Sequence, residues 1–422
     1  MGVFTRSRAG SILGGIAVVG VSAVFLAGCA GDSGGGSGTT DPSESLDLKI
    51  GTALPVTGNL AFLGPPEIAG TEYAASEVNA ANAGVTIEMI QGDSGDTDNK
   101  AYETEIPRLL NEGVSAIIGA ASSGTSLQFI DQVVGAGVIQ FSPANTSAAF
   151  TTYDDNGLYF RTAPSDTLQG EVLGNLIAES GAQTLGMIVL NDSYGTGLAG
   201  FVKDAFEAAG GTVVAEPTYN TGDTNFSAQI SEVVAANPDA IALITFEEVK
   251  TMLPELFAAG VPADKLYFVD GNLANFGSNG IDVGGSLEGA KGTLPGLSID
   301  AITDFTSSLQ TFWTDEGNDE LTEFSYAAES YDAVVLLALA SLAAGSTDGA
   351  AIADKLQEVS GGSGDGTTCT SFAECAEIIN SGGVADYDGI SGKITFDDVG
   401  DPTDASIGIY QYTADNDYVA YQ

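Results

Sequence analysis

The chain has 422 residues, and its 57 Asp and Glu against 12 Lys and Arg give a formal net charge of −45 at pH 7. A surface this acidic repels nucleic-acid phosphates and anionic lipid head groups, so nucleic acid is excluded as a partner. The sequence contains no His, which excludes mechanisms that need an imidazole base or a His-ligated metal.

The first 29 residues have the pattern of a secretory signal. Arg6 and Arg8 precede an apolar run from Ile12 to Leu26, which is followed by Ala27, Gly28 and Cys29. The run is too short to span a bilayer, which takes about 20 apolar residues, and small residues precede the cysteine as a peptidase requires. The segment is similar to the bacterial lipobox, which implies that Cys29 is lipidated and anchors the exported chain to the outer face of the cell membrane. A plain signal peptide with an incidental cysteine is the alternative.

Residues 30–46 are rich in Gly, Ser, Thr and Asp, a composition that predicts a flexible, solvated tether. About 375 residues remain. Because a single hydrophobic core stops growing at about 250–300 residues, this length predicts two domains.

From Asp47 onward, apolar strand-like segments alternate with amphipathic helical segments. This alternation predicts parallel sheets covered by helices on both faces. The first series comprises strands over 48–54, 85–91, 114–120 and 138–143 and helices over 66–82, 102–110 and 125–134. The second comprises strands over 185–192, 212–217, 240–246 and 265–270 and helices over 167–179, 198–209, 226–236 and 250–259. A less regular remainder adds segment 288–294, helices over 302–313, 327–344 and 350–359, and a strand over 392–398.

Two further cysteines, Cys369 and Cys375, lie close together in the segment CTSFAEC. In an exported chain, this spacing predicts a local disulfide. A cysteine-based metal site would need more ligands than this neighbourhood offers, so no metal is expected.

Ligands of open parallel sheets bind beyond the carboxyl ends of the strands. After one predicted strand comes Ala121-Ser122-Ser123-Gly124-Thr125, where hydroxyls and free backbone N–H groups at a helix start suit a carboxylate. More hydroxyls follow another strand in segment 142–147, and Asp270 comes directly after Val269, where the last strand of the second series ends. A carboxylate beside such a turn would hold an ammonium group, so the pattern favours a small zwitterion.

The chain resembles the leucine/isoleucine/valine-binding proteins of the type I periplasmic-binding-protein family. The likeness rests on motifs in the same order along nearly the whole mature chain: KIGTALPVTGNLAFLG, AIIGAASSGTS, SPANTSAAFT, YFRTAPSDTLQG, NDSYGTGLAG and TNFSAQI. The resemblance implies two Rossmann-like α/β lobes with parallel-rich sheets, joined by a three-segment hinge near Phe160–Thr162. It places lobe one at 47–160 and 289–405 and lobe two at 161–288 and 406–422.

The resemblance also implies a function and a site. It implies an amino-acid-binding lipoprotein that serves an ABC permease and ATPase as a monomer, without catalysis or a cofactor. Ser123 and the turn Ala144-Asn145-Thr146 would bind the carboxylate and amine, Tyr194 would close over the ligand from the other lobe, and Asp270 would pair with the ammonium. Ser122, Phe246, Phe62 and Leu63 complete the expected ligand-binding set.

Two positions depart from the family pattern. Leu63 stands where several relatives have an aromatic residue, which would remodel the side-chain pocket. Phe246 is followed by Glu247 and Glu248 where relatives often place Tyr, and this acid would favour a more polar or cationic ligand.

Several alternatives stay open at this point. The segment Gly195–Gly200 spells G-x-G-x-x-G after a predicted strand, with Glu216 about twenty residues on, as in a nicotinamide-binding enzyme. The two serines at 122 and 123 could be helix caps, Tyr194 and Phe246 could be packing residues, and Asp270 a solvated loop acid. A sensor that signals to a membrane partner would share every feature of an importer's binding protein.

Overall fold

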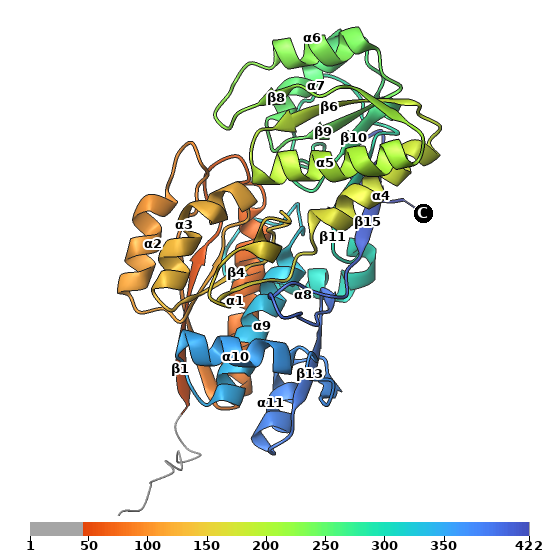
Figure 1. The fold of residues 1–422 in the computed structure, drawn as a ribbon. Coiled ribbons are helices and arrows are strands. Elements are labelled where there is room, and N and C mark those ends of the chain that lie inside the picture. Colours follow the sequence, from red (N-terminus) through yellow and green to blue (C-terminus); the bar gives the residue numbers. More distant parts are fainter. Residues whose placement is uncertain (1–44, 422) are drawn as a thin grey trace, which may run out of the picture. The chain divides into compact units, whose positions relative to one another are not determined.

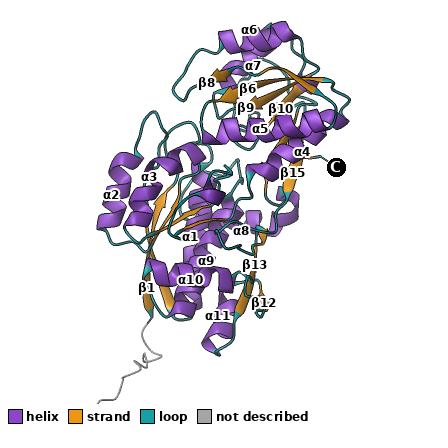
Figure 2. Cartoon of the chain, in the orientation of Figure 1, coloured by secondary structure: helices purple, strands orange, loops and turns teal. Residues whose placement is uncertain are grey.

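Two parallel-rich sheets organise the chain, which the computed structural model describes over residues 45–421 (Figures 1 and 2). The predicted signal peptide, the lipidation site at Cys29 and the tether up to residue 44 lie outside the described residues. From Ser43 onward the chain clusters as one unit.

The first sheet is fully parallel, with strand order β2-β1-β3-β4-β5. Its strands are β1 (Leu46–Ala53), β2 (Val85–Ile90), β3 (Ala116–Gly119), β4 (Ile139–Ser142) and β5 (Tyr159–Arg161). The helices that connect them are α1 (Gly64–Ala81), α2 (Tyr102–Asn111) and α3 (Ser123–Gly135).

Side chains of the first sheet alternate between two apolar layers, as a strand period of two requires. On β3, Ile117 joins the layer that contains residues of α2 and α3. Its neighbours Ala116 and Ile118 join the layer that contains residues of α1 and α9 (Ala327–Ala344). Because both faces are covered, the central strand β3 is buried along its whole length, and polar loops gather at the carboxyl ends of the strands.

The second sheet has eight strands in the order β16-β15-β11-β10-β9-β6-β7, with β8 also paired to β6. Its strands are β6 (Thr184–Leu190), β7 (Thr212–Ala215), β8 (Thr218–Tyr219), β9 (Ala240–Ile244), β10 (Leu266–Phe268), β11 (Lys291–Pro295), β15 (Ile407–Tyr412) and β16 (Tyr418–Ala420). The accompanying helices are α4 (Asp166–Glu179), α5 (Ser193–Ala208), α6 (Ser227–Ala236) and α7 (Val249–Ala258). Strands β6 to β11 pair in parallel, whereas β15 and β16 pair antiparallel.

The remaining elements pack with the first sheet or extend it. They are α8 (Thr303–Asp315), α9, α10 (Gly349–Val359), α11 (Phe372–Asn380) and the small sheet of β12 (Thr367–Cys369), β13 (Ala385–Gly389) and β14 (Gly392–Lys393). The predicted disulfide is confirmed: Cys369 at the end of β12 bonds to Cys375 in α11, with an S–S distance of 2.09 Å. Helix α9 is long and apolar enough to cross a membrane, but 83% of it is buried inside the protein, as in a core helix.

Four sequence predictions need correction. Helix α5 begins at Ser193 rather than 198, because Asp192 accepts a hydrogen bond from the N–H of Gly195 and caps the helix. Of the predicted strand 392–398, only Gly392–Lys393 is a strand. The sequence reading missed α11, β5, β13, β15 and β16. The boundary at Glu288 does not match the sheets, because β11 pairs with β10 and β15 and so belongs to the second sheet.

The chain therefore links the two sheets three times. We call these segments the first link (residues 162–165, between β5 and α4), the second link (residues 296–298, after β11) and the third link (residues 402–406, before β15). The remaining predicted lobe boundaries stay a prediction.

A buried ion pair fixes the start of the first link. The guanidinium of Arg161, which is fully buried, donates to both carboxylate oxygens of Asp401 at 2.6 and 2.8 Å. It also donates to the carbonyl oxygens of Asn145 and Ser147 at 3.2 and 2.8 Å. The last residue of β5, the loop after β4 and the segment before the third link are thus held by one side chain.

Replacing Arg161 with Met should lower the free energy of unfolding by about 3–5 kcal/mol, because it leaves a carboxylate and two carbonyls without their donor. The measurement is urea denaturation. The control is Lys203→Met at an exposed pair with Glu216 (3.2 Å), where a loss of about 0–1 kcal/mol is expected. Equal losses in the two variants would contradict a central role for Arg161.

Candidate functional site

A small cavity lies where the carboxyl ends of the two sheets face each other. It is lined from the first-sheet side by Leu60, Leu63, Ala121, Ser122, Ser123, Ala144, Thr146 and Tyr326, and from the second-sheet side by Tyr194, Phe246, Asp270 and Gly271. All but Tyr326 follow a strand, as expected for a ligand site of open parallel sheets. Eight of the ten residues predicted to bind ligand therefore meet around one space.

The first-sheet wall offers hydroxyls at the start of α3 and in the loop after β4. The side chain of Ser122 caps α3 by accepting from the N–H of Thr125 at 3.3 Å, so the capping alternative is correct for this residue. The hydroxyl of Ser123 accepts from the N–H of Ser147 at 3.2 Å. The hydroxyl of Thr146 is buried and has no hydrogen-bond partner among residues 45–421. A buried hydroxyl without a partner costs free energy unless a bound group supplies one.

Asn145 and Phe62 do not line this cavity. The amide of Asn145 donates to the carbonyls of Ala120 and Ala121 at 3.0 and 2.8 Å, and its oxygen accepts from the hydroxyl of Tyr159 at 3.1 Å. Asn145 therefore supports the two loops from behind. Phe62 lines a separate cavity together with Trp313.

Asp270 is the buried acid of the second-sheet wall and is not a solvated loop residue. Its carboxylate accepts from the hydroxyls of Tyr194 and Tyr326 at 2.7 and 2.8 Å and from the amide of Gln169 at 3.0 Å. Burial raises the pKa of Asp270, and these donors oppose the rise. Neutral donors hold the carboxylate in a fixed place without neutralising it, so it can still attract a cation.

Sequence reasoning missed Tyr326, which stands just before α9 with φ of 61°. No strand precedes Tyr326, so a search of the residues that follow predicted strands does not include it. Its hydroxyl brings the residue before α9, a helix that packs with the first sheet, into contact with Asp270 of the second. Asp270 thus bonds to both sides of the cavity.

The ring of Tyr194 lies in the first turn of α5 and stacks on Phe246, with ring centroids 5.2 Å apart and planes 18° apart. Its hydroxyl also accepts from the N–H of Gly271 at 3.3 Å. The stacked pair forms a rigid apolar wall that carries one polar group at its tip. Tyr194 and Phe246 therefore pack against each other and also line the cavity.

Asp166, which the sequence analysis did not single out, is a second buried acid beside the cavity. It is the first residue of α4, and its N–H donates to the carbonyl of Thr146 at 2.7 Å. Its carboxylate oxygens accept no hydrogen bond in the described part of the chain. Burial, and after it the charge of Asp270, raises the pKa of Asp166 well above its usual value. The raised pKa favours the protonated form of Asp166, so the ionised carboxylate of this pair is Asp270.

Glu247 and Glu248 do not face the cavity, so the expectation that they choose the ligand is wrong. Glu247 pairs with Lys250 at 2.7 Å. Glu248 accepts from the amide of Asn59 at 2.6 Å, from the N–H of Phe246 at 3.1 Å and from a tyrosine hydroxyl. Because Asn59 follows β1 and Glu248 follows β9, this bond joins the two sides next to the cavity.

The cavity has a volume of about 10 Å³, which is room for about one water molecule. An amino acid is many times larger, so its entry requires the two walls to separate. The Asn59–Glu248 bond and the bond from the hydroxyl of Ser147 to the carbonyl of Ser193 (3.0 Å) would break in that motion.

The G-x-G-x-x-G segment does not form a phosphate-binding turn. Its three glycines lie inside α5. A side chain at Gly195 would meet the carbonyl of Leu190 at 2.2 Å, whereas Gly197 and Gly200 face open space. Packing of the helix on β6 explains the first glycine, and no close approach requires the other two. Over residues 45–421, no group of three or more Cys, Asp or Glu is placed to hold a metal.

Two α/β halves that meet around a small cavity, with hydroxyls on one wall and a held carboxylate on the other, define the class of two-lobed ligand-binding receptors. The chain belongs to the periplasmic binding protein family, whose model, described as "Periplasmic binding protein", matches residues 47–376. Membership of this family confirms the resemblance seen in the sequence, and members of the branched-chain amino acid group are among the relatives and structural neighbours.

Individual relatives agree with this assignment. The chain is 24% identical to the "chemotactic signal transduction system substrate-binding protein BasB" of Halobacterium salinarum, over 82% of this chain and 83% of that one. It is 32% identical to the leucine-, isoleucine-, valine-, threonine- and alanine-binding protein of Pseudomonas aeruginosa, over 45% of this chain and about half (51%) of that one.

Solved structures show the same fold. The leucine binding protein LivK from Thermotoga maritima MSB8 superposes with a TM-score of 0.72 at 23% identity, covering 89% of this chain and 98% of that one. The protein LivJ from Streptococcus pneumoniae, in complex with isoleucine, superposes with a TM-score of 0.68 at 22% identity, covering 89% and 100%. The predicted two-lobed type I fold is confirmed.

The stability of the protein should depend on pH through Glu248. Burial raises the pKa of Glu248 to about 7 in the folded chain, against 4.5 for the free side chain. A raised pKa favours the protonated form, so its contribution is present below pH 4.5 and is lost as the pH rises through about 7. The free energy of unfolding of the wild type should fall between pH 4.5 and pH 8. In Glu248→Gln we expect this fall to be smaller by about 1–3 kcal/mol.

The measurement is urea unfolding at several pH values. Glu247→Gln removes a neighbouring carboxylate that lies on the surface, so this control should follow the wild-type curve. Identical pH dependence in wild type and Glu248→Gln would show that the buried carboxyl does not contribute.

Proposed function

We propose that the protein is an extracytoplasmic substrate-binding lipoprotein that captures an α-amino acid between its two lobes and delivers it to an ABC importer. One observation carries the proposal: the cavity between the sheets has an unpartnered hydroxyl, Thr146, on one wall and a buried, fixed carboxylate, Asp270, on the other. A zwitterion with its two charges a few ångströms apart matches this arrangement. Isoleucine in the pneumococcal structure and the amino acids in the name of the Pseudomonas relative support this ligand class.

In this proposal the carboxylate of the ligand accepts hydrogen bonds from Ser123, Thr146 and backbone N–H groups at the start of α3. The partial positive charge of the helix N-terminus adds to these bonds. The ammonium donates to Asp270, and its positive charge favours ionisation of the neighbouring Asp166. The side chain lies against Leu63 and the Tyr194–Phe246 pair.

Binding proceeds by rotation of the lobes about the three links. A ligand that contacts both walls stabilises the form in which the walls are close, because only that form gains all of its contacts. The importer then distinguishes loaded from empty receptor by the arrangement of the two lobes. No bond of the ligand is made or broken.

At a fixed concentration, a ligand that binds more tightly should stabilise the folded protein more. Thermal unfolding of residues 47–422 against a panel of amino acids, amides and short peptides should single out one or a few amino acids. At a ligand concentration 100 times Kd, the expected gain in unfolding free energy is about 2.7 kcal/mol. A panel in which amino acids have no effect and another class of compound does would overturn the assignment.

Calorimetry on variants tests the roles of the two acids. Asp270→Asn should weaken amino-acid binding by about 10- to 100-fold, because a charge-assisted hydrogen bond contributes about 1.5–3 kcal/mol. Asp166→Asn should weaken it less, since that carboxyl acts from behind Thr146. Glu247→Gln, which removes one charge outside the cavity, is the matched control and should bind as wild type does. Unchanged affinity in Asp270→Asn would assign the ammonium to another group.

The lipid anchor has its own test. In a host that processes lipoproteins, Cys29→Ala should move the protein from the membrane fraction to the soluble extracytoplasmic fraction and abolish labelling by a radioactive fatty acid. Retention in the membrane fraction would mean that the chain is held there in another way.

We further propose that the mature protein is a monomer.

A second candidate function is a ligand sensor that signals to a membrane partner. It is favoured by the halobacterial relative, whose name refers to chemotactic signal transduction and whose similarity spans most of both chains. Deletion of the gene distinguishes the two functions. Loss of amino-acid uptake with normal behavioural responses indicates an importer component, and the opposite pattern indicates a sensor.

A further inference from the structure

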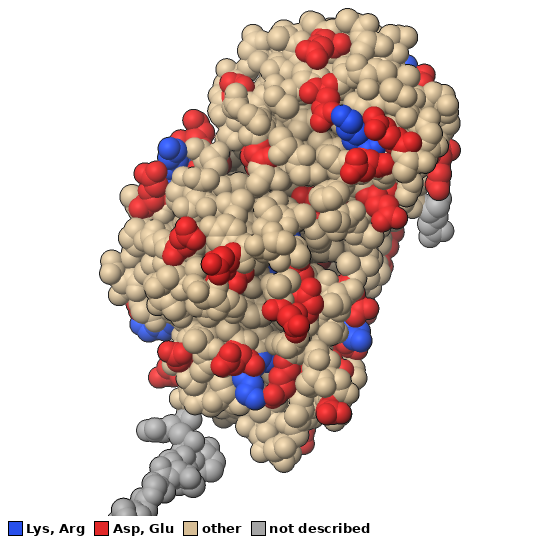
Figure 3. Space-filling view, viewed as in Figure 1, with Lys and Arg blue, Asp and Glu red and all other residues tan. Residues whose placement is uncertain are grey.

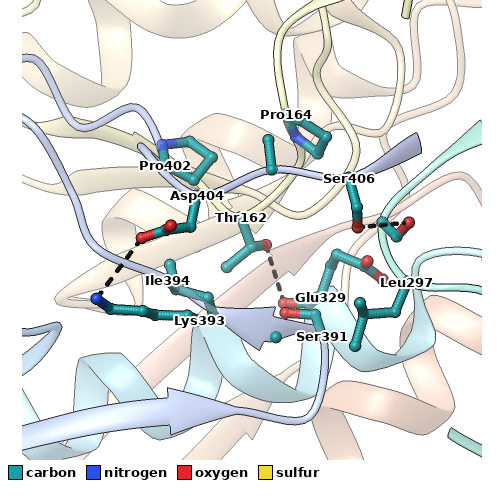
Figure 4. Close-up of a pocket in the computed structure, with 13 residues that line it drawn as sticks. Thr162, Pro164, Leu297, Glu329, Ser391, Lys393, Ile394, Pro402, Asp404 and Ser406 are labelled. Atoms are coloured by element: carbon teal, nitrogen blue, oxygen red, sulfur yellow. Dashed lines mark hydrogen bonds and ion pairs between the residues drawn. The ribbon is translucent and has the colours of Figure 1, made fainter. Parts of the chain in front are cut away.

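A second cavity, of about 230 Å³, lies where the three links between the sheets meet. Figure 4 shows its residues, which come from every link and from the elements behind them. The lining residues are Thr162 and Pro164 of the first link, Gly296 and Leu297 of the second, Pro402, Asp404, Ala405 and Ser406 of the third, and Glu329 and Ser391–Ile394 behind them. None of them lines the cavity around Asp270. We call this space the hinge cavity.

The second and third links are bonded to each other, and the first link is bonded to α9. The N–H of Gly296 donates to the carbonyl of Ser406 at 2.9 Å, and the hydroxyl of Ser406 donates to the carbonyl of Gly296 at 3.0 Å. The hydroxyl of Thr162 donates to the carbonyl of Glu329 at 3.0 Å (Figure 4). Any rotation of one sheet relative to the other changes the backbone angles of these segments and therefore the walls of the hinge cavity.

Glu329 presents a carboxyl group to this space. Its side chain lies in the first turn of α9 and is 6% exposed. A side-chain carbon at Gly296 would come within 2.4 Å of its Oε1, so only glycine leaves room for the carboxyl group at the cavity wall. No other residue between 45 and 421 donates a hydrogen bond to this carboxyl group. Burial raises its pKa to about 8.

The surroundings of Glu329 supply no free cation. The groups that face it from the packed elements are Glu67 of α1, Asp332 of α9, Tyr326 before α9 and Tyr410 of β15. Glu67 is also buried without a hydrogen-bond donor among the described residues. At the rim, Lys393 pairs with Asp404 at 3.8 Å. The local charge is therefore neutral when Glu329 is protonated and negative when it is ionised, and the ionised form favours a cation over an anion.

Part of the wall of the hinge cavity is apolar, and the rest is formed by polar residues and backbone. Pro164, Leu297 and Ile394 form the apolar part, and Leu297 is 37% exposed. A compact ligand with one positive charge and a short apolar body complements these walls and the carboxyl group together. An anion would meet Glu329 without a donor, and an inorganic cation would leave the apolar walls without a partner.

We propose that the hinge cavity is a second binding site, which takes a small alkylammonium ion with its charge on Glu329 and its alkyl group against Leu297, Pro164 and Ile394. Because all three links form its walls, an occupant stabilises one relative position of the two sheets. Occupancy therefore changes the affinity of the cavity around Asp270. Binding of the alkylammonium ion in the hinge cavity does not depend on the proposed function. Its effect on the affinity of the cavity around Asp270 does rest on that function.

Isobutylammonium chloride is a suitable probe, and isobutanol is its uncharged counterpart of the same shape. Titration calorimetry on residues 47–422 should detect binding of the ammonium ion and at least tenfold weaker binding of the alcohol. Phosphate and borate buffers are required, because Tris is itself an organic ammonium ion. Equal binding of the two compounds would overturn the assignment of a charge-selective site.

Two variants test the role of the carboxyl group in opposite directions. Glu329→Gln keeps the size of the side chain and should weaken isobutylammonium at least tenfold. Lys393→Met, which removes a repelling charge and releases Asp404, should strengthen it about two- to fivefold. If Glu329→Gln fails to fold, Lys393→Met decides the question, and weaker binding in that variant would overturn the proposal.

The binding should also depend on pH. An ammonium ion pairs with the ionised carboxyl group, so affinity should rise about tenfold per pH unit between pH 6 and 7.5 and level off above pH 8. Glu329→Gln should show no such rise. A flat profile in wild type would contradict the assignment of the charge to Glu329.

A final pair of measurements separates this site from the other one. Asp270→Asn should leave isobutylammonium binding unchanged, and loss of binding in that variant would place the probe in the cavity around Asp270 instead. Saturating isobutylammonium should shift the Kd of the amino-acid ligand by a measurable factor, and the amino acid should shift the Kd of the probe by the same factor. Unshifted constants with intact binding of both ligands would refute the coupling and leave the proposed function untouched.

Discussion

The guanidinium of Arg161 connects the base of the hinge between the two sheets to the loop that contains Thr146. It ends β5, from which the first link starts, and it bonds to Asp401, which precedes the third link. Two more of its hydrogen bonds go to carbonyls on either side of Thr146. The loop that offers a hydroxyl to a ligand is therefore fixed by the same buried charge that fixes the base of the hinge. A rigid wall and a defined pivot are both needed if ligand contact is to select one position of the lobes.

The carboxyl groups on the surface and those in the interior are accommodated in different ways. Outside, scattered carboxylates repel one another and water screens them, as the face in Figure 3 shows by its many acidic and few basic side chains. Inside, Asp270 is held by hydroxyl and amide donors instead of a basic partner. Buried acids without such donors, such as Asp166 and Glu329, have raised pKa values. With few Lys and Arg and no His, the chain meets the cost of buried charge by protonation or by neutral donors.

Sequence reasoning located most strands and helices because both sheets are mostly parallel, and their parallel strands are largely apolar runs separated by amphipathic helices. It also brought Ser123, Thr146, Tyr194 and Asp270 to one place, since the carboxyl ends of parallel strands share an edge. Sequence reasoning failed where contacts with residues distant in sequence determine the position of a side chain. Tyr326 follows no strand, and only the fold brings its hydroxyl to Asp270.

The same limit explains the errors at Glu248 and β11. A glutamate next to a site residue reads as part of the site, but Asn59, nearly two hundred residues earlier, draws its carboxylate away. Segment 291–295 reads as belonging to the helices that follow it, but hydrogen bonds to β10 and β15 place it in the second sheet. The start of α5 was locally decided, because Asp192 caps it, and a cap search at that position would have found it.

The placement of β15 has a consequence for how the chain is assembled. Lys291 on β11 faces Gln411 on β15, and between them the chain folds α8 to α11 and the small disulfide-bonded sheet. A nascent chain that has reached β11 thus presents an open strand edge, which remains unpaired until a segment more than a hundred residues later emerges. Unpaired edges invite wrong partners, and contacts this remote in sequence form slowly. The second sheet is therefore the part of the molecule most in need of protection while it is being made.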